Sequence, residues 1–164
     1  MQDQSISQER SVTHSTFVLE RHYPVRPERV FAALSDPAKK QRWYAAEGPG
    51  QDVESFEMDF RVGGNEIARY RFKSGTPFPG TALTAEGSYQ DIVPNQRVVI
   101  ASTMALGGTR ISASLVTFEL VPTDEGTEFI LTHQGAFFEG SDGPERREDG
   151  WRKLLDKLAA ELKQ

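Results

Sequence analysis

Histidines are the residues here best suited to proton transfer or metal binding near neutral pH. His14, His22 and His133 do not have the spacing of metal ligands. His133 shares its parity with Phe129 and Leu131 in a strand-like segment, so its side chain is expected to face the interior. There it could be a hydrogen-bonded core residue, or it could orient a ligand or move a proton. We therefore include it among the candidate ligand-binding residues.

The acidic and basic residues do not suggest a catalytic pair. Glu57 and Asp59 alternate with apolar residues, as do Arg69 and Arg71, which predicts that all four face solvent. The run 145–149 is expected to form a solvated helix face with local ion pairs. The sequence also lacks the short motifs of serine hydrolases, phosphate-binding loops, dinucleotide-binding folds and zinc peptidases. We predict no catalytic residue, no metal site and no cofactor.

The aromatic residues carry a stronger signal, because many of them fit inward positions of strands or buried helix faces. For any one of them, core packing is the ordinary explanation. Together they could line a mostly apolar cavity in which Tyr and Trp supply polar groups. The predicted ligand-binding residues are Trp43, Phe56, Met58, Phe60, Tyr70, Phe72, Tyr89, Phe118, Phe129, His133, Trp151 and Leu155.

One long helix and a series of strands must position these side chains. An apolar stripe with helical spacing predicts the helix near the C-terminus, and its members are Trp151, Leu154, Leu155, Leu158, Ala159 and Leu162. Two short helices are expected from Pro27 and from Asp36-Pro37 to Trp43. Alternating segments between turn signals predict strands over 16–23, 56–60, 68–72, 82–93, 97–105, 112–121 and 127–134. The pattern predicts an α+β fold with a curved antiparallel β-sheet.

The predicted sheet is much wider than the helix that has to cover it. Six or seven strands about 4.8 Å apart span roughly 30 Å, whereas a helix with its side chains is about 10–12 Å across. The sheet must therefore curl around the helix, and aromatic side chains, short helices or a ligand must fill the remaining space. Apolar pockets of this kind are the usual sites of small-molecule binding.

Length and charge restrict the class of protein. The 164 residues fit a single domain over residues 14–164, after a tail over residues 1–13 that lacks apolar periodicity and is expected to be disordered. The net charge of −5 argues against a nucleic-acid partner. The sequence contains no cysteine, signal peptide or membrane span, so a cytoplasmic protein is expected, as a monomer or a homodimer.

An ordered series of short motifs resembles one superfamily. The motifs are YPVRPERVFAAL from Tyr23, Asp36-Pro37, Arg42-Trp43, DFRVGG from Asp59, GSYQDI from Gly87, TEF from Thr127, Thr132-His133, and Gly150-Trp151 with Leu154 and Leu158. On these motifs, residues 14–163 resemble the SRPBCC (START/Bet v 1-like) superfamily. Within it they are similar to stand-alone relatives of the C-terminal domain of the activator of the heat-shock-protein-ninety ATPase. The resemblance implies a helix-grip fold with a deep cavity between the sheet and the long C-terminal helix.

The resemblance does not imply one activity. Members of the superfamily bind lipids, hormones or polyketides, some catalyse cyclisation or hydrolysis, and the eukaryotic activator domain binds a chaperone. We predict non-enzymatic binding of a small, mostly apolar molecule, such as a lipid, in that cavity. One alternative is a module that binds a chaperone or a regulatory protein in a stress response, which would expose an apolar patch. The other is a polyketide cyclase-like enzyme with His133 or a pocket tyrosine in acid–base work, which would need polar groups converging in the cavity.

Overall fold

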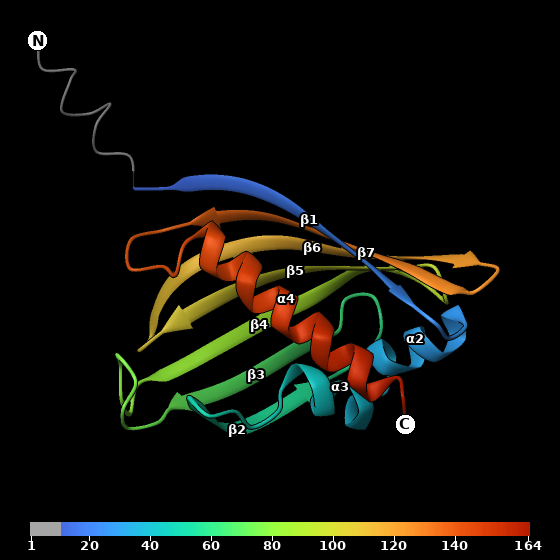
Figure 1. Cartoon of the computed structure of the whole chain (residues 1–164). Helices are drawn as coiled ribbons and strands as arrows, with labels where there is room; N and C mark the ends of the chain where they lie inside the picture. The colour runs from blue at the N-terminus through green and yellow to red at the C-terminus, as the bar shows by residue number, and fades with distance from the viewer. Residues whose placement is uncertain (1–10) are drawn as a thin grey trace, which may run out of the picture.

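The computed structural model describes residues 11–164, and these form one curved sheet with a long helix across its concave face (Figure 1). All neighbouring strands pair antiparallel, in the order β1-β7-β6-β5-β4-β3-β2. The strands are β1 Thr13–Tyr23, β2 Gln51–Met58, β3 Asn65–Phe72, β4 Ala82–Val93, β5 Arg97–Leu106, β6 Thr109–Thr123 and β7 Gly126–Phe137. The helices are α2 Pro27–Ser35, α3 Pro37–Tyr44 and α4 Pro144–Glu161. This architecture confirms the predicted α+β helix-grip fold.

Each helix begins with a proline, which suits the first helical position because the missing N–H would have no partner there. Asp36 caps α3, since its side chain accepts hydrogen bonds from the backbone N–H groups of Ala38 at 2.9 Å and Lys39 at 3.4 Å. The predicted cap and the two short helices are therefore confirmed.

The strand boundaries differ from the predicted ones where the pattern is interrupted. β2 begins at Gln51 rather than Phe56, because a bulge between Val53 and Ser55 breaks the alternation that identified the strand. Phe60 follows the end of β2 instead of lying inside it. Of the tail predicted over residues 1–13, residues 1–10 lie outside the described residues, and Thr13 already pairs with β7.

The long helix buries its stripe against the sheet, as its spacing predicted. Leu155 and Leu158 are completely buried, Trp151 and Leu162 are buried, and Leu154 is partly buried against the same core. Tyr23 on β1 donates a hydrogen bond to the backbone carbonyl of Leu155 at 2.9 Å, which joins the edge of the sheet to the helix.

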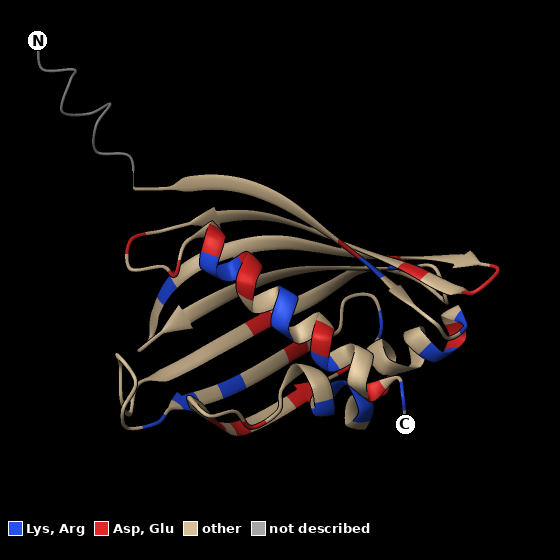
Figure 2. Ribbon diagram, viewed as in Figure 1, with Lys and Arg blue, Asp and Glu red and all other residues tan. Residues whose placement is uncertain are grey.

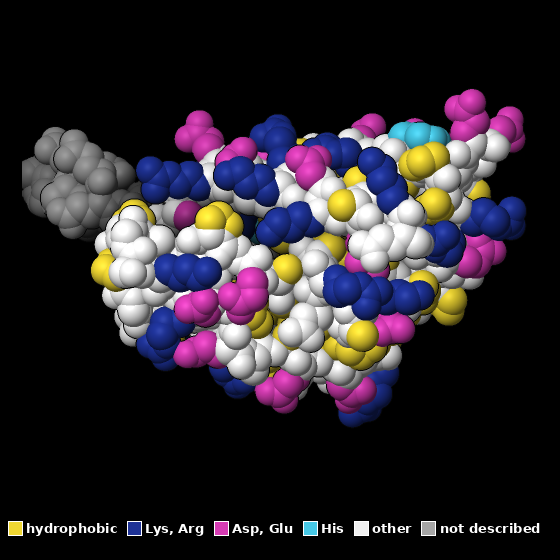
Figure 3. Space-filling view, turned by 60° about the horizontal axis from the view of Figure 1, so that its bottom comes forward, with side chains coloured by type: hydrophobic (Ala, Val, Ile, Leu, Met, Phe, Trp, Pro, Cys, Tyr) yellow, Lys and Arg dark blue, Asp and Glu magenta, His cyan; other side chains and the backbone are white. Residues whose placement is uncertain are grey.

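Charged side chains lie mainly on the outside of this framework. Figure 2 shows both basic and acidic residues along α4, where Lys153 pairs with Asp149 at 3.4 Å and Arg152 pairs with Glu148. On the face shown in Figure 3, basic and acidic side chains are interleaved with scattered apolar ones. That face therefore has no extended surface of a single charge.

Candidate functional site

A row of small residues crosses the inner face of the sheet beneath α4. Strand register places Gly87, Ser102, Ser114 and Gly135 side by side on β4, β5, β6 and β7. The adjacent row contains larger side chains, which are Tyr89, Ile100, Val116, His133 and Phe17. We call the row of four small residues the trench. Its two ends are covered by neighbouring side chains, since a Cβ atom on Gly87 would clash with Ile100 and one on Gly135 with Phe137 and His133.

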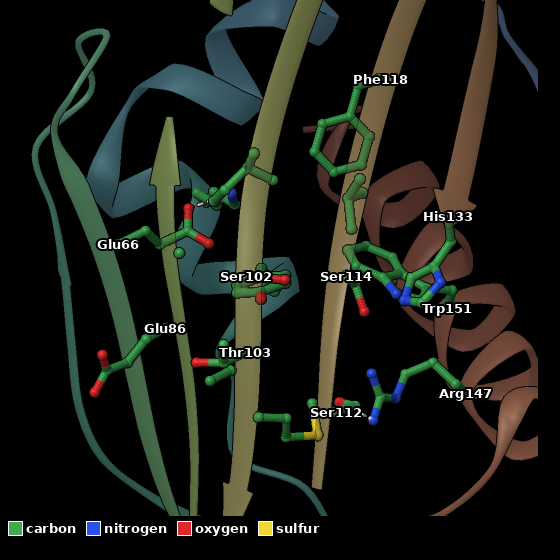
Figure 4. A pocket seen from close by; sticks show the side chains of 17 residues that line it. Glu66, Glu86, Ser102, Thr103, Ser112, Ser114, Phe118, His133, Arg147 and Trp151 are labelled. Carbon is green, nitrogen blue, oxygen red and sulfur yellow. Dashed lines mark hydrogen bonds and ion pairs between the residues drawn. The ribbon is translucent and has the colours of Figure 1, made fainter. Parts of the chain in front are cut away.

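A cavity lies between this trench and α4 (Figure 4). It offers about 50 Å³ to the centres of water-sized molecules, which is room for a few waters. Its walls combine apolar and polar side chains, so the interior is less apolar than the sequence suggested. The walls comprise Lys40, Tyr44, Glu66, Ala85, Glu86, Gly87, Ile100, Ser102, Thr103, Met104, Ser112, Ser114, Val116, Phe118, His133, Arg147 and Trp151.

Arg147 is a buried cation in the first turns of α4, with 8% of its surface exposed. Its guanidinium donates hydrogen bonds to both carboxylate oxygens of Asp142 at 2.8 Å and to the hydroxyl of Ser112 at 2.9 Å. The guanidinium carbon also lies 5.1 Å from the centre of the Phe137 ring. The prediction of a solvated face for residues 145–149 is therefore wrong for Arg147, which can be buried because Asp142, just before the helix, balances its charge.

His133 is almost completely buried, with 1% exposed, and lines the cavity. Its imidazole stacks on Phe17 at 4.7 Å and on Phe137 at 6.0 Å between ring centres. Gly135 permits this packing, since a Cβ atom there would lie only 2.9 Å from Cε1 of His133. Burial, and then the charge of Arg147, lower the pKa of His133 to about 4, so the imidazole is neutral at pH 7.

A second polar cluster lies toward β3. Lys40 on α3 forms an ion pair with Glu66, and both side chains are buried. Tyr89 also donates a hydrogen bond to Oε1 of Glu66 at 2.5 Å, and the ammonium of Lys40 lies 4.7 Å from the centre of the Tyr44 ring. Burial, and then the charge of Glu66, raise the pKa of the Tyr44 and Tyr89 hydroxyls well above the usual value. Both tyrosines therefore keep their protons.

Three of the twelve predicted ligand-binding residues, Phe118, His133 and Trp151, line this cavity. The other nine lie elsewhere in the structure, and they are Trp43, Phe56, Met58, Phe60, Tyr70, Phe72, Tyr89, Phe129 and Leu155. Trp43, for example, is completely buried and donates from Nε1 to the carbonyl of Ala33 at 2.9 Å. Tyr70 belongs to a separate apolar cluster with Ala45 and Ala68.

The charged and hydroxyl residues of the cavity walls are not among the predicted residues, although several of them continue the apolar patterns. Glu66 has the parity of Tyr70 on β3, and Ser114 has the parity of Phe118 on β6. Arg147 lies one helical turn before Trp151 on the buried stripe. Extending each apolar pattern by one or two positions would have included these polar residues.

Neither metal binding nor membrane crossing is indicated by the described part of the chain. Residues 11–164 contain no group of three or more His, Cys, Asp or Glu side chains that could hold a metal ion. No helix in this range combines the length and apolar character that crossing a membrane requires.

The fold agrees with what sequence and structure comparisons find. Residues 24–163 match the family described as activator of Hsp90 ATPase homolog 1-like protein. The chain therefore belongs to this family, within the SRPBCC superfamily, which confirms the resemblance drawn from its motifs. No curated protein matches the sequence.

Several solved structures are similar over almost the whole chain. A Rhizobium loti protein is 46% identical, with a TM-score of 0.82, and the match covers 93% of this chain and 99% of that one. An uncharacterized Rhizobium leguminosarum protein is 37% identical, with a TM-score of 0.84 and coverage of 93% and 97%. The AHSA1 protein of Silicibacter pomeroyi is 29% identical, with a TM-score of 0.69 and coverage of 90% and 97%.

Proposed function

We propose that this protein binds a small, mostly apolar molecule between the sheet and α4. The observation that carries the proposal is the cavity left under the helix at the two central positions of the trench, Ser102 and Ser114, which carry small side chains. Larger apolar residues at these two positions would fill the cavity. Phe118, Trp151 and Val116 provide apolar walls on which a ligand could pack.

The size of the cavity limits the ligand. About 50 Å³ for water-sized centres is far below the roughly 300–1,000 Å³ of typical pockets for drug-sized ligands. Met104 lines the cavity and is half-buried, and its unbranched side chain adapts easily to a neighbour. We therefore expect a short ligand, or one that is admitted when Met104 changes its rotamer.

Calorimetric titration with 1-hexanol, a neutral ligand with a short apolar chain, tests the proposal. Burial of its apolar surface is worth about 25 cal/mol per Å², less the cost of association, so an affinity of about 10 μM to 1 mM is expected for a ligand of this size. Ser114→Leu fills the trench and should weaken binding about tenfold or more. Ala113→Leu is the matched control, because the neighbouring residue on β6 faces the other side of the sheet.

Two results would contradict the proposal. One is the absence of binding to the wild-type protein at the highest soluble concentration of 1-hexanol, and the other is unchanged affinity in Ser114→Leu. Thermal unfolding of both variants, followed by circular dichroism, establishes that they are folded at the temperature of the titration.

Acid–base catalysis is the second candidate, because polar groups do converge in the cavity. His133, however, has a pKa of about 4 and is a weak base at pH 7, whereas a catalytic base works best when its pKa lies near the working pH. Tyr44 and Tyr89 are protonated for the reason given above. These groups are therefore better suited to holding a ligand than to moving protons.

The interaction with a chaperone or regulatory protein gains no specific support from the described surface. The large apolar side chains that are exposed in residues 11–164 are divided among β1, β6 and two loops. They are Val18, Val62, Phe78, Leu115 and Val121.

A further inference from the structure

Arg147 leaves one edge of its guanidinium free. Nε and Nη2 donate to Asp142, and Nη2 also donates to Ser112. Nη1 forms no hydrogen bond within residues 11–164. Figure 4 shows the guanidinium reaching from α4 toward Ser112, on the side of the cavity where Ser114 and His133 lie. Two N–H groups are therefore available to an acceptor in the cavity.

Hydroxyl groups extend this set of donors. The oxygen of Ser112 accepts from Arg147, so its own hydrogen can point to another acceptor. Ser114 follows on the same face of β6, and Ser102 lies opposite Ser114 on β5. The hydroxyls of Ser102 and Ser114 both border the cavity. This part of the wall is therefore rich in donors.

His133 supplies an independent sign of a missing partner. Within residues 11–164, its Nδ1 is the one buried side-chain polar atom without a hydrogen bond. Such an atom costs free energy unless water or a ligand satisfies it. The imidazole stacks on the rings of Phe17 and Phe137, and this packing restrains it from turning toward another protein group.

The two ends of the cavity differ in their free hydrogen-bonding groups. Glu66 accepts from Lys40 and Tyr89, so the carboxylate near β3 has its own partners. At the other end Asp142 balances the charge of Arg147, but Nη1 of Arg147 and the hydroxyl of Ser112 still have hydrogens to donate. An acceptor is therefore favoured beside Arg147 rather than beside Glu66.

We propose that Arg147, Ser112 and Ser114 hold the carboxylate of a small amphipathic ligand, whose apolar part lies against Phe118 and Trp151. Charge-assisted hydrogen bonds from a guanidinium to a carboxylate are stronger than those between neutral groups. The inference rests on the proposed function, because it names the class of ligand for the same cavity.

Calorimetric titration with hexanoate and hexanamide tests this assignment, because the two compounds share one apolar chain. Wild-type protein should bind hexanoate about tenfold more tightly or better, as expected for an additional charge-assisted hydrogen bond. Arg147→Met should bind the two compounds equally. Arg152→Met is the matched control on the exposed side of the same helix, and it should keep the preference.

Equal affinity of the wild-type protein for hexanoate and hexanamide would overturn the assignment, even if Arg147→Met did not fold. If 1-hexanol binds while this preference is absent, the small-ligand function stands and only the carboxylate site fails. If 1-hexanol, hexanoate and hexanamide all fail to bind, both proposals fail.

Discussion

The buried side chain of His133 is neutral at pH 7, because its surroundings disfavour the protonated imidazole. Its pKa is about 4 in the folded protein because of burial and then the charge of Arg147, against about 6.5 in an unfolded chain. Between these values the unfolded state binds more protons than the folded state. The free energy of unfolding is therefore expected to fall as the pH drops from about 6.5 to about 4, on the order of 2–3 kcal/mol. Urea unfolding across this range measures the change.

Variants separate this effect from other titrations. His133→Gln should remove the loss between about pH 6.5 and 4, whereas His22→Gln should keep it, because the His22 side chain is 40% exposed. Burial tends to raise the pKa of Asp142, but hydrogen bonds and charge from Arg147 outweigh burial and lower it. The stability that the Asp142 carboxylate adds to the folded state is therefore lost only as the pH falls below its usual pKa of 3.8. That range lies outside the interval in which His133 changes the free energy of unfolding. An unchanged pH dependence in His133→Gln would show that another group is responsible.

A second prediction concerns the buried ion pair of Lys40 and Glu66. Lys40→Met should lower the free energy of unfolding by about 3–5 kcal/mol, because it leaves the Glu66 carboxylate buried without its cation. The double variant Lys40→Met/Glu66→Gln should be more stable than Lys40→Met, since the neutral amide can still accept from Tyr89. Chemical denaturation of both variants measures the difference. A double variant that is less stable than Lys40→Met would contradict this account.

Among the elements, α4 has one position that weakens it without an evident packing role. Gly150 lies inside the helix, and a Cβ atom there would meet nothing within 4 Å. Gly150→Ala should therefore raise the free energy of unfolding by about 0.5–1 kcal/mol, through helix propensity and a less flexible unfolded chain. Gly126→Ala should destabilise, because Gly126 has a φ of 145° and a Cβ atom there would lie 2.2 Å from the carbonyl oxygen of Tyr23. Thermal unfolding compares the two, and a lower melting temperature for Gly150→Ala would contradict the prediction.

A substitution at Leu158 tests how tightly α4 is packed against the sheet. This side chain is completely buried, and Leu158→Ala should cost about 2–5 kcal/mol, the usual range for a large-to-small core change. Urea unfolding measures the loss. A loss below about half a kcal/mol would mean that the helix is not packed against the sheet as described.

Most elements could be predicted because their signals are local. Alternation, turn residues and the apolar stripe of α4 depend on neighbouring residues only, so the order of strands and helices followed from them. The start of β2 could not be predicted, since the bulge beside Val53 changes which residues face inward. A bulge depends on how a strand pairs with its neighbour, and a local sequence pattern does not reveal that pairing.

The candidate site could be predicted only in part, because it is a property of the whole molecule. Phe118, His133 and Trp151 were found from their inward parity or helical spacing. Arg147 and Lys40 were not, since a charged residue is usually exposed unless a partner compensates it. The partner of Lys40 is Glu66, 26 residues away, and only the packing of α3 onto the sheet brings the two together.

The central claim is that a small ligand occupies the space between the trench and α4. NMR spectroscopy of the methyl-labelled protein with 1-hexanol tests its location directly, through nuclear Overhauser effects between protein methyl groups and ligand protons. The account predicts such contacts with Ile100, Met104 and Val116, which line the cavity. Contacts with the exposed methyl groups of Val18 and Leu115 instead would place binding on the outer surface and contradict it.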